Sequence, residues 1–268
     1  MAKITAIVNQ KGGVGKTTTA LNLGYALSEA GEKVLLIDFD PQASLSVALG
    51  IKSDNKPGIQ TLMAEAIEEK EIQIDSNTIE IKENLNLIPA NLQLAGIEMT
   101  LVSVMCKEQM LKSVIESIKK EYDYIIIDCS PSLGTLTINA LTACDSLIIP
   151  VTPEYLSAKG LGLLIDVIRK TKRRINPNLK IDGVLMTMLN SRTNLSKEMI
   201  RAVNESAKYI KENFDLDIQV FKIKIPASVK AGEAILNRKS IIEYDPKNKV
   251  SEAYLKFADE WKVVNKLE

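Results

Sequence analysis

The chain has 268 residues, 46% hydrophobic and 25% charged, with a formal net charge of zero, a composition ordinary for a globular protein. No apolar run approaches the roughly 20 residues of a membrane-spanning helix, and the N-terminus lacks a signal-peptide pattern. The absence of histidine excludes Ser-His-Asp triads and histidine metal sites. We therefore expect a cytoplasmic protein whose chemistry depends on carboxylates, lysines, hydroxyls, backbone amides and a hard metal ion.

Short apolar runs alternate with helical patterns, which predicts an α/β fold with a mostly parallel twisted sheet flanked by helices. In chain order, we expect strands at residues 4–8, 33–37, 85–88, 124–127, 146–151, 180–188 and 218–225. We expect helices at residues 16–30, 59–67, 91–105, 107–120, 157–174, 196–213 and from about 250 onward. The polar segment 51–83 is expected to add a weak hairpin over the sheet. Without a long linker or repeat, we expect one domain over residues 1–268.

The segment Asn9-Gln10-Lys11-Gly12-Gly13-Val14-Gly15-Lys16-Thr17-Thr18-Thr19 lies between the first predicted strand and the first predicted helix. Its glycines let backbone N–H groups approach phosphate oxygens, and the following helix N-terminus adds positive potential there. Lys16 can reach the β- and γ-phosphates, and the Thr17 hydroxyl can bind Mg²⁺. The general pattern G-x-x-x-x-G-K-[ST] is met from Gly15 onward, but Gln10 stands where its first glycine belongs. The segment predicts a P-loop that binds nucleotide through residues 12–18.

Acidic side chains end two of the predicted strands. Asp38 and Asp40 follow the second strand, and at positions i and i+2 both can face the carboxyl end of the sheet. Asp128 ends the apolar run 125–127 in the Walker B form, where it can hold Mg²⁺ through water. A turn at Asp38–Pro41 or a helix cap at Asp128 would explain the same residues without a metal.

The sequence Lys-Gly-Gly-x-Gly-Lys-Thr-Thr resembles the deviant Walker A motif of the ParA, MinD and nitrogenase-iron-protein class, with Lys11 as its signature lysine. The resemblance to the ParA/Soj family extends over nearly the whole chain. It continues through the segments 131–134, 140–145, 149–155, 183–188, 192–195, 225–226, 233–234 and 244–246. Several ordered motifs over such a span are more specific than a P-loop alone.

This resemblance implies an ATPase that uses ATP and Mg²⁺. Lys16 and Thr17 match the phosphate and metal residues, Asp128 the Walker B acid, Asp38 a support of the metal site and Asp40 the catalytic acid that positions water. Lys11 matches the lysine that reaches the nucleotide of the facing subunit in an ATP-dependent homodimer. Asn190 and Pro226 fall where the family holds adenine.

The resemblance also implies a ParB-like activator protein, non-specific double-stranded DNA as a partner and association with the nucleoid. Residues 1–150 hold 12 Lys and Arg against 19 Asp and Glu, whereas residues 151–268 hold 22 against 15. Such asymmetry fits a surface for a polyanion as well as solvated helix faces. Arg192, Lys222 and Lys230 are the DNA-binding candidates. Ala227 stands where close relatives commonly have arginine, which puts the strength of DNA binding in question.

The alternative is a MinD-like ATPase that cycles on membranes, or one that positions a protein cargo. A membrane-binding C-terminal helix would be basic and amphipathic. An apolar stripe is present at Tyr254, Phe257, Trp261, Val264 and Leu267, but its polar side mixes lysines with acids. Docking of this helix on the core is therefore expected, without membrane binding. An iron–sulfur carrier is disfavoured because Cys129 and Cys144 lack the cluster spacing.

Overall fold

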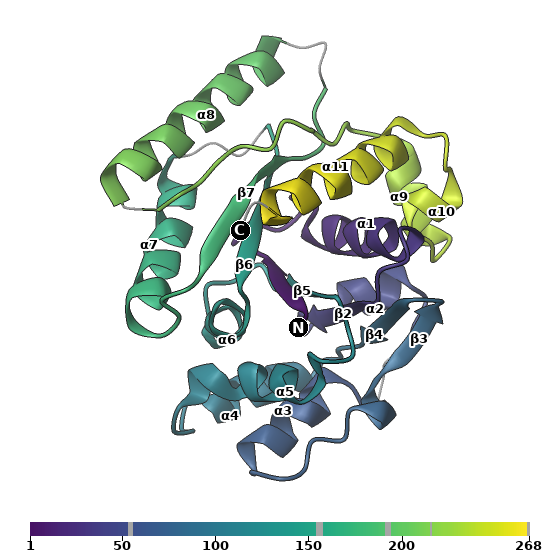
Figure 1. Ribbon diagram of the computed structural model, residues 1–268, viewed down its shortest axis with the longest axis vertical. Coiled ribbons are helices and arrows are strands. Elements are labelled where there is room, and N and C mark those ends of the chain that lie inside the picture. Colours follow the sequence, from purple (N-terminus) through teal and green to yellow (C-terminus); the bar gives the residue numbers. More distant parts are fainter. Residues whose placement is uncertain (53–55, 154–157, 191–193, 215, 267–268) are drawn as a thin grey trace.

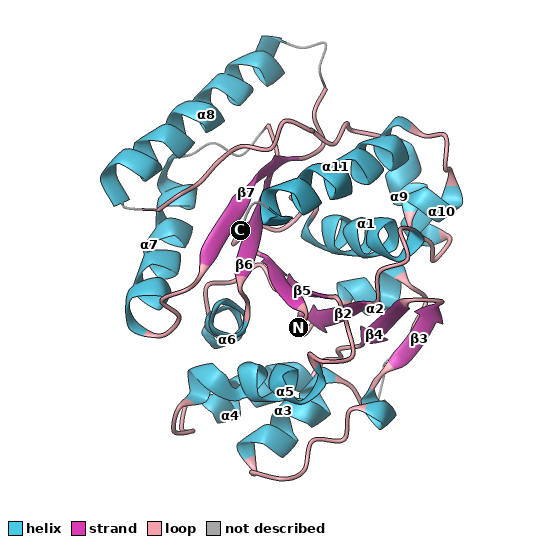
Figure 2. Cartoon of the chain, in the orientation of Figure 1, coloured by secondary structure: helices cyan, strands magenta, loops and turns pink. Residues whose placement is uncertain are grey.

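The computed structural model describes residues 1–52, 56–153, 158–190, 194–214 and 216–266. Within them, one sheet has the strand order β3-β4-β2-β5-β1-β6-β7 (Figure 1, Figure 2). The strands are β1 (Lys3–Ile7), β2 (Val34–Phe39), β3 (Ile79–Lys82), β4 (Leu85–Ile88), β5 (Tyr124–Cys129), β6 (Ser146–Val151) and β7 (Lys180–Met186). Every neighbouring pair is parallel except β3 with β4. The predicted mostly parallel sheet is confirmed.

Helices cover both faces of the sheet (Figure 2). One face carries α1 (Lys16–Glu29), α2 (Ser44–Ala48), α9 (Val229–Leu236), α10 (Ile241–Tyr244) and α11 (Lys249–Lys266). The other carries α3 (Ile59–Ile67), α4 (Gln93–Leu101), α5 (Met110–Ile118), α6 (Thr135–Ala143), α7 (Ala158–Arg174) and α8 (Asn194–Phe214). Short 3-10 helices lie at Asp75–Asn77 and Lys107–Gln109. Strand residues alternate between the two cores, so a strand buried on both faces reads as a continuous apolar run.

The C-terminal helix α11 packs on the core. Tyr254, Phe257 and Trp261 are at most 1% exposed, and Val264 packs against the same apolar cluster. The predicted stripe is thus used in folding as far as the structure describes it; Leu267 lies outside the described residues. Among the described helices, none has the length and apolar character needed to cross a membrane.

The predicted strand at residues 218–225 is wrong. This segment and the residue after it form only isolated parallel bridges, Val184 with Val220 and Leu189 with Pro226. The backbone N–H groups of Lys222 and Ile223 donate instead to the Glu260 carboxylate on α11, at 2.7 and 2.8 Å. Because the Ile223 N–H, which would otherwise face β7, bonds to Glu260, the ladder is interrupted there.

One further expectation needs correction, and four of the described α-helices were not expected. The hairpin lies within the sheet at its edge, where β3 pairs antiparallel with β4 across a turn with Asn84 at φ 62°, and not over the sheet. Helix α6 was not expected because it is buried on nearly all sides and so lacks the periodicity that marks a surface helix. The short helices α2, α9 and α10 were likewise not expected from the sequence.

Candidate nucleotide-binding site

The P-loop runs from the end of β1 to the start of α1, at the carboxyl edge of the sheet. Gly13 and Gly15 have φ values of 75° and 85°, a left-handed conformation that favours glycine. Helix α1 starts at Lys16 without a side-chain cap from Gly15 and without an acidic residue in its first turn. The first N–H groups of the helix are therefore available to an anion.

The crest of the P-loop, meaning the segment around Val14, is fixed by Thr187, which follows β7. The Thr187 hydroxyl oxygen lies 2.8 Å from the Val14 carbonyl oxygen and 3.1 Å from that of Val151. Val14 is fully buried, whereas Gly12 and Gly13 are exposed. The loop is thus held in shape, and its glycine-rich part faces solvent.

Lys16 is buried at the centre of the site, with an exposed fraction of 7%. Its ammonium group donates a hydrogen bond to the Lys11 carbonyl oxygen at 3.1 Å. Burial lowers the pKa of Lys16, while the nearby Asp128 and Asp40 carboxylates oppose that change. A buried cation beside free backbone amides is suited to holding a triphosphate.

Asp38 and Asp128 are neighbours because the parallel register of β2 and β5 pairs them directly. Both are buried, with exposures of 0% and 1%. Burial raises the pKa of Asp128 well above its ordinary value, and Asp38 raises it further. The Thr17 hydroxyl and the Lys16 ammonium lower it.

The oxygens of the Asp128 carboxylate are both buried and accept no hydrogen bond of normal geometry from any residue that the structure describes. Thr17 acts on the pKa of this group without completing its hydrogen bonding. A buried carboxylate without hydrogen-bond donors destabilises the fold unless a cation binds its oxygens. Mg²⁺ fits, since it prefers oxygen ligands and is commonly held by one or two carboxylates together with water and substrate phosphates.

Asp38 and Asp40 differ in their environment. The Asp38 carboxylate accepts hydrogen bonds from the Ser46 backbone and hydroxyl and lies 3.4 Å from the Asp40 N–H. Burial raises the pKa of Asp38 to about 6, although the Ser46 hydrogen bonds lower it. Asp40 is 8% exposed, and its carboxylate accepts a hydrogen bond from the Gln42 N–H at 2.9 Å. Asp38 therefore anchors this loop, and Asp40 lies on the loop itself.

A largely apolar cavity of about 490 Å³ opens beside the P-loop. It is lined by residues of the P-loop helix, the segment after β7, the segment leading into α9, α9 itself and α11: Gly15, Thr18, Thr187, Met188, Ile225, Pro226, Ala227, Ser228, Val229, Ala231, Gly232, Ile235, Val250 and Tyr254. Pro226, one of the two residues expected near adenine, is among the lining residues. Asn190 is exposed and is not among the lining residues.

Most of the lining was not predicted, because it comes from segments far apart in the sequence. Met188, Tyr254 and the residues of α9 carry no motif of their own. The one available signal was the pair Ile225-Pro226, which matches a motif of the family. It indicated one part of the cavity but not the other residues that line it.

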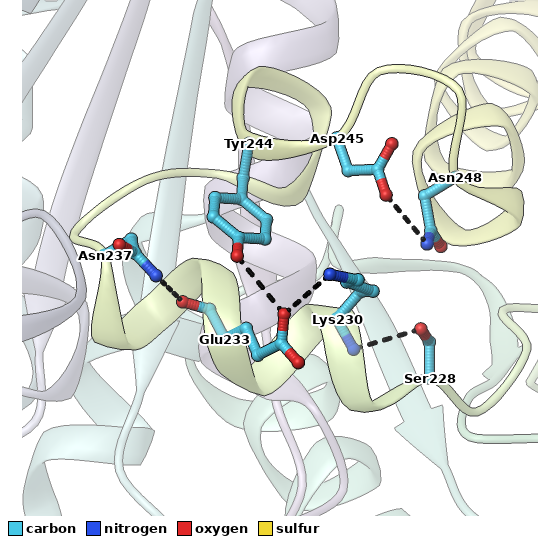
Figure 3. Close-up of polar contacts among 7 residues, drawn as sticks. All are labelled: Ser228, Lys230, Glu233, Asn237, Tyr244, Asp245 and Asn248. Atoms are coloured by element: carbon cyan, nitrogen blue, oxygen red, sulfur yellow. Dashed lines mark hydrogen bonds and ion pairs between the residues drawn. The ribbon is translucent and has the colours of Figure 1, made fainter.

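The predicted DNA-binding residues fall in different surroundings. Arg192 lies outside the described residues. Lys222 lines a groove of about 340 Å³ with Lys224, Lys249 and Lys256. The Lys230 ammonium pairs with the Glu233 carboxylate at 2.9 Å, and Glu233 also accepts a hydrogen bond from the Tyr244 hydroxyl (Figure 3).

Comparison with known proteins identifies the family. A family model described as "AAA domain" matches residues 2–181. The chain is 46% identical to "Sporulation initiation inhibitor protein Soj" of Bacillus subtilis, over 97% of this chain and 98% of that protein. It is 41% identical to "Chromosome partitioning protein ParA" of Myxococcus xanthus, over 95% of this chain and 86% of that protein.

A solved structure with the same fold was crystallised with nucleotide. The structure described as cobyrinic acid a,c-diamide synthase of Mycobacterium smegmatis, with a bound ATP analogue and magnesium, has a TM-score of 0.80 and 33% identity. The match covers 97% of this chain and 93% of that one. These ligands agree with the ATP and Mg²⁺ expected from the sequence. The chain belongs to the ParA/Soj family of P-loop ATPases.

Proposed function

We propose that the chain is a Mg²⁺-dependent ATPase of DNA partitioning that dimerises with ATP bound and dissociates after hydrolysis. The observation that carries the proposal is the buried, incompletely bonded Asp128 carboxylate beside a formed P-loop and an apolar cavity. Together they offer places for a divalent cation, a triphosphate and a purine base. The 41% identity to a chromosome partitioning protein ParA supports the partitioning role.

The residues of the site divide the chemistry of hydrolysis. The backbone amides of residues 12–17 and the Lys16 ammonium hold the phosphates, and Thr17 and Asp128 hold Mg²⁺, with Asp38 fixing the neighbouring loop. Bound Mg²⁺ neutralises charge on the phosphate oxygens. Asp40 orients a water for in-line attack. Phosphoryl transfer needs mainly positioning and charge stabilisation, both of which these groups supply.

Lys11 supplies a further positive charge across the dimer. The P-loop presents Lys11 beside the exposed Gly12 and Gly13, so its side chain begins at the open edge of the site. In a symmetric dimer with nucleotide between the subunits, this lysine reaches the facing nucleotide and acts as an arginine finger does.

Non-specific DNA binding is supported by the groove that contains Lys222. Four lysines line it against one acid, Glu252, and it shares Pro226 with the apolar cavity. Lysines that contact phosphates give salt-dependent binding without sequence preference. Lys230 is the weaker candidate, because its ammonium group already pairs with Glu233. A ParB-like partner would stimulate ATP hydrolysis by the protein on the nucleoid.

Two variants test the ATPase assignment. Lys16→Ala should lose nucleotide affinity in isothermal titration with Mg·ATP. Asp40→Ala should keep that affinity, form dimers with ATP by light scattering, and not release phosphate. An Asp40→Ala protein that hydrolyses ATP at the wild-type rate would refute the assignment.

DNA binding is tested with the ATP-locked Asp40→Ala dimer. It should be retained on plain duplex DNA at low salt and released as salt rises, and Lys222→Ala should weaken retention for every sequence alike. Failure to bind duplex DNA while still dimerising with ATP would remove the DNA from the proposal and favour a protein cargo.

A further inference from the structure

The side chain of Asn9 lies where the P-loop leaves the sheet. The backbone ladder between β1 and β6 ends with the Val8 N–H donating to the Ile148 carbonyl at 3.0 Å. Alternate carbonyls of a strand face the same neighbour, so Pro150 is the next acceptor on this edge of β6. The Asn9 side-chain amide donates to that carbonyl at 2.7 Å. The side chain thus extends the ladder while the backbone turns into the loop.

The other end of the Asn9 amide holds the loop. Its Oδ1 accepts a hydrogen bond from the Lys11 N–H at 3.0 Å, the local pattern of an Asx-turn. The Lys11 carbonyl in turn accepts the hydrogen bond from the Lys16 ammonium. Asn9 is 1% exposed, so water does not compete for these bonds. One buried side chain therefore joins β6 to the backbone N–H of Lys11, while the Lys11 carbonyl, in the next peptide group, contacts Lys16.

The rest of the loop has a separate attachment. Thr187 holds Val14 through the Val14 carbonyl, and the loop continues directly into α1. Loss of Asn9 would release the Lys11 side of the loop and leave the crest and the helix N-terminus in place. Phosphate binding and the direction of Lys11 are therefore separable.

We propose that Asn9 is a positioning residue for hydrolysis: its amide fixes the Lys11 peptide and so directs the Lys11 side chain toward the facing subunit. This inference rests on the proposed role of Lys11. Asn9 itself is buried, with an exposed fraction of 1%. Its effect on the rate passes through Lys11.

A double-mutant cycle in ATP hydrolysis tests the inference. Asn9→Ala should lower kcat roughly 10- to 100-fold, because small displacements of catalytic groups have effects of that size. The KM for Mg·ATP should stay within about threefold, because the crest of the loop is retained. In a Lys11→Ala background, Asn9→Ala should change kcat by less than about twofold, since residues that act as a unit are not additive. Asn9→Ser, which can accept the Lys11 N–H bond, should recover part of the kcat that Asn9→Ala loses.

Asn139→Ala is the matched control. Asn139 is fully buried and also joins backbone groups outside its own helix, the Leu111 N–H at 3.1 Å and the Lys107 carbonyl at 2.9 Å, but it lies on α6. It should lower the urea midpoint as Asn9→Ala does and leave kcat unchanged.

The outcomes separate the inference from the function on which it rests. If Asn9→Ala lowers kcat equally in the wild-type and Lys11→Ala backgrounds, or leaves kcat unchanged where Lys11→Ala reduces it, the positioning role is overturned. If Lys11→Ala itself hydrolyses ATP normally, the proposed role of Lys11 fails first. If Asn9→Ala does not fold, Asn9→Ser carries the same cycle.

Discussion

The Asp38 carboxylate accepts hydrogen bonds from both the backbone N–H and the hydroxyl of Ser46, at 2.8 and 2.7 Å. The Ser46 hydroxyl oxygen also accepts a hydrogen bond from the Ala90 N–H at 3.2 Å. These bonds join the carboxyl end of β2 to α2 and to the segment after β4. The loop with Asp40 runs between Asp38 and Ser46, so this pair sets its position.

Ser46→Ala should therefore affect both stability and turnover. It removes one hydrogen bond to a buried carboxylate and leaves the Ala90 N–H without an acceptor, which costs about 1–3 kcal/mol in the free energy of unfolding. Urea denaturation measures that loss, and kcat should fall because Asp40 is less well positioned. Ser44→Ala, at an exposed position of the same helix, should change stability by less than about 0.5 kcal/mol. Equal effects of the two variants would contradict this account.

Asp128→Asn should stabilise the nucleotide-free protein while abolishing hydrolysis. Burial disfavours the charged form of Asp128 and raises its pKa, and both carboxylate oxygens are incompletely bonded. A neutral amide should raise the free energy of unfolding by about 1–2 kcal/mol. Saturating Mg·ATP should reverse the order in thermal unfolding, since only the wild type binds the cation fully. A less stable nucleotide-free variant would show that the carboxylate is already satisfied.

Gly232 tests the assignment of the apolar cavity. It lies on α9 among the lining residues, and a Cβ at this position would meet nothing within 4 Å. Gly232→Leu should occupy the cavity and weaken ATP affinity at least about tenfold, the factor that corresponds to 1.4 kcal/mol. Gly232→Ala should raise stability by about 0.5–1 kcal/mol through helix propensity.

The matched control for Gly232→Leu is Gly96→Leu on α4, where a Cβ also meets nothing within 4 Å. Nucleotide titrations of both variants decide the matter. Unchanged affinity in Gly232→Leu would place the base elsewhere.

Asp182 predicts a pH dependence of stability away from the site. It is 5% exposed and accepts hydrogen bonds from Ser146 and from the Trp261 indole N–H, each at 2.7 Å. Burial raises the pKa of Asp182 despite these bonds. The folded state therefore binds the proton more tightly than the unfolded state, whose Asp pKa is about 3.9.

The contribution of protonated Asp182 to the free energy of unfolding is complete below the unfolded-state pKa. It is lost as pH rises through the raised pKa of the folded state. Asp182→Asn should remove this fall. Urea denaturation of wild type and variant from about pH 4 upward, compared as a difference, isolates Asp182 from the other buried acids. Parallel curves would contradict the raised pKa.

Local patterns predicted the features that depend on neighbouring residues in the chain. The P-loop could be predicted from the sequence because its glycines, Lys16 and Thr17 lie within one short segment between a strand and a helix. Helix α3 was predicted with the bounds that the structure has, and the central strands differ by only one or two residues. Asp128 was placed at a strand end because the apolar run before it is continuous.

What only the tertiary structure decided concerns pairings between distant segments. The register of β2 against β5 makes Asp38 and Asp128 neighbours, and Glu260 of α11 draws residues 222 and 223 out of a strand. The apolar cavity likewise exists only when α9 and α11 meet the P-loop. Sequence periodicity reports which face of an element is buried, but it does not say which other element covers that face. The P-loop was therefore determined locally, whereas the apolar cavity and the environment of the acids arise from packing.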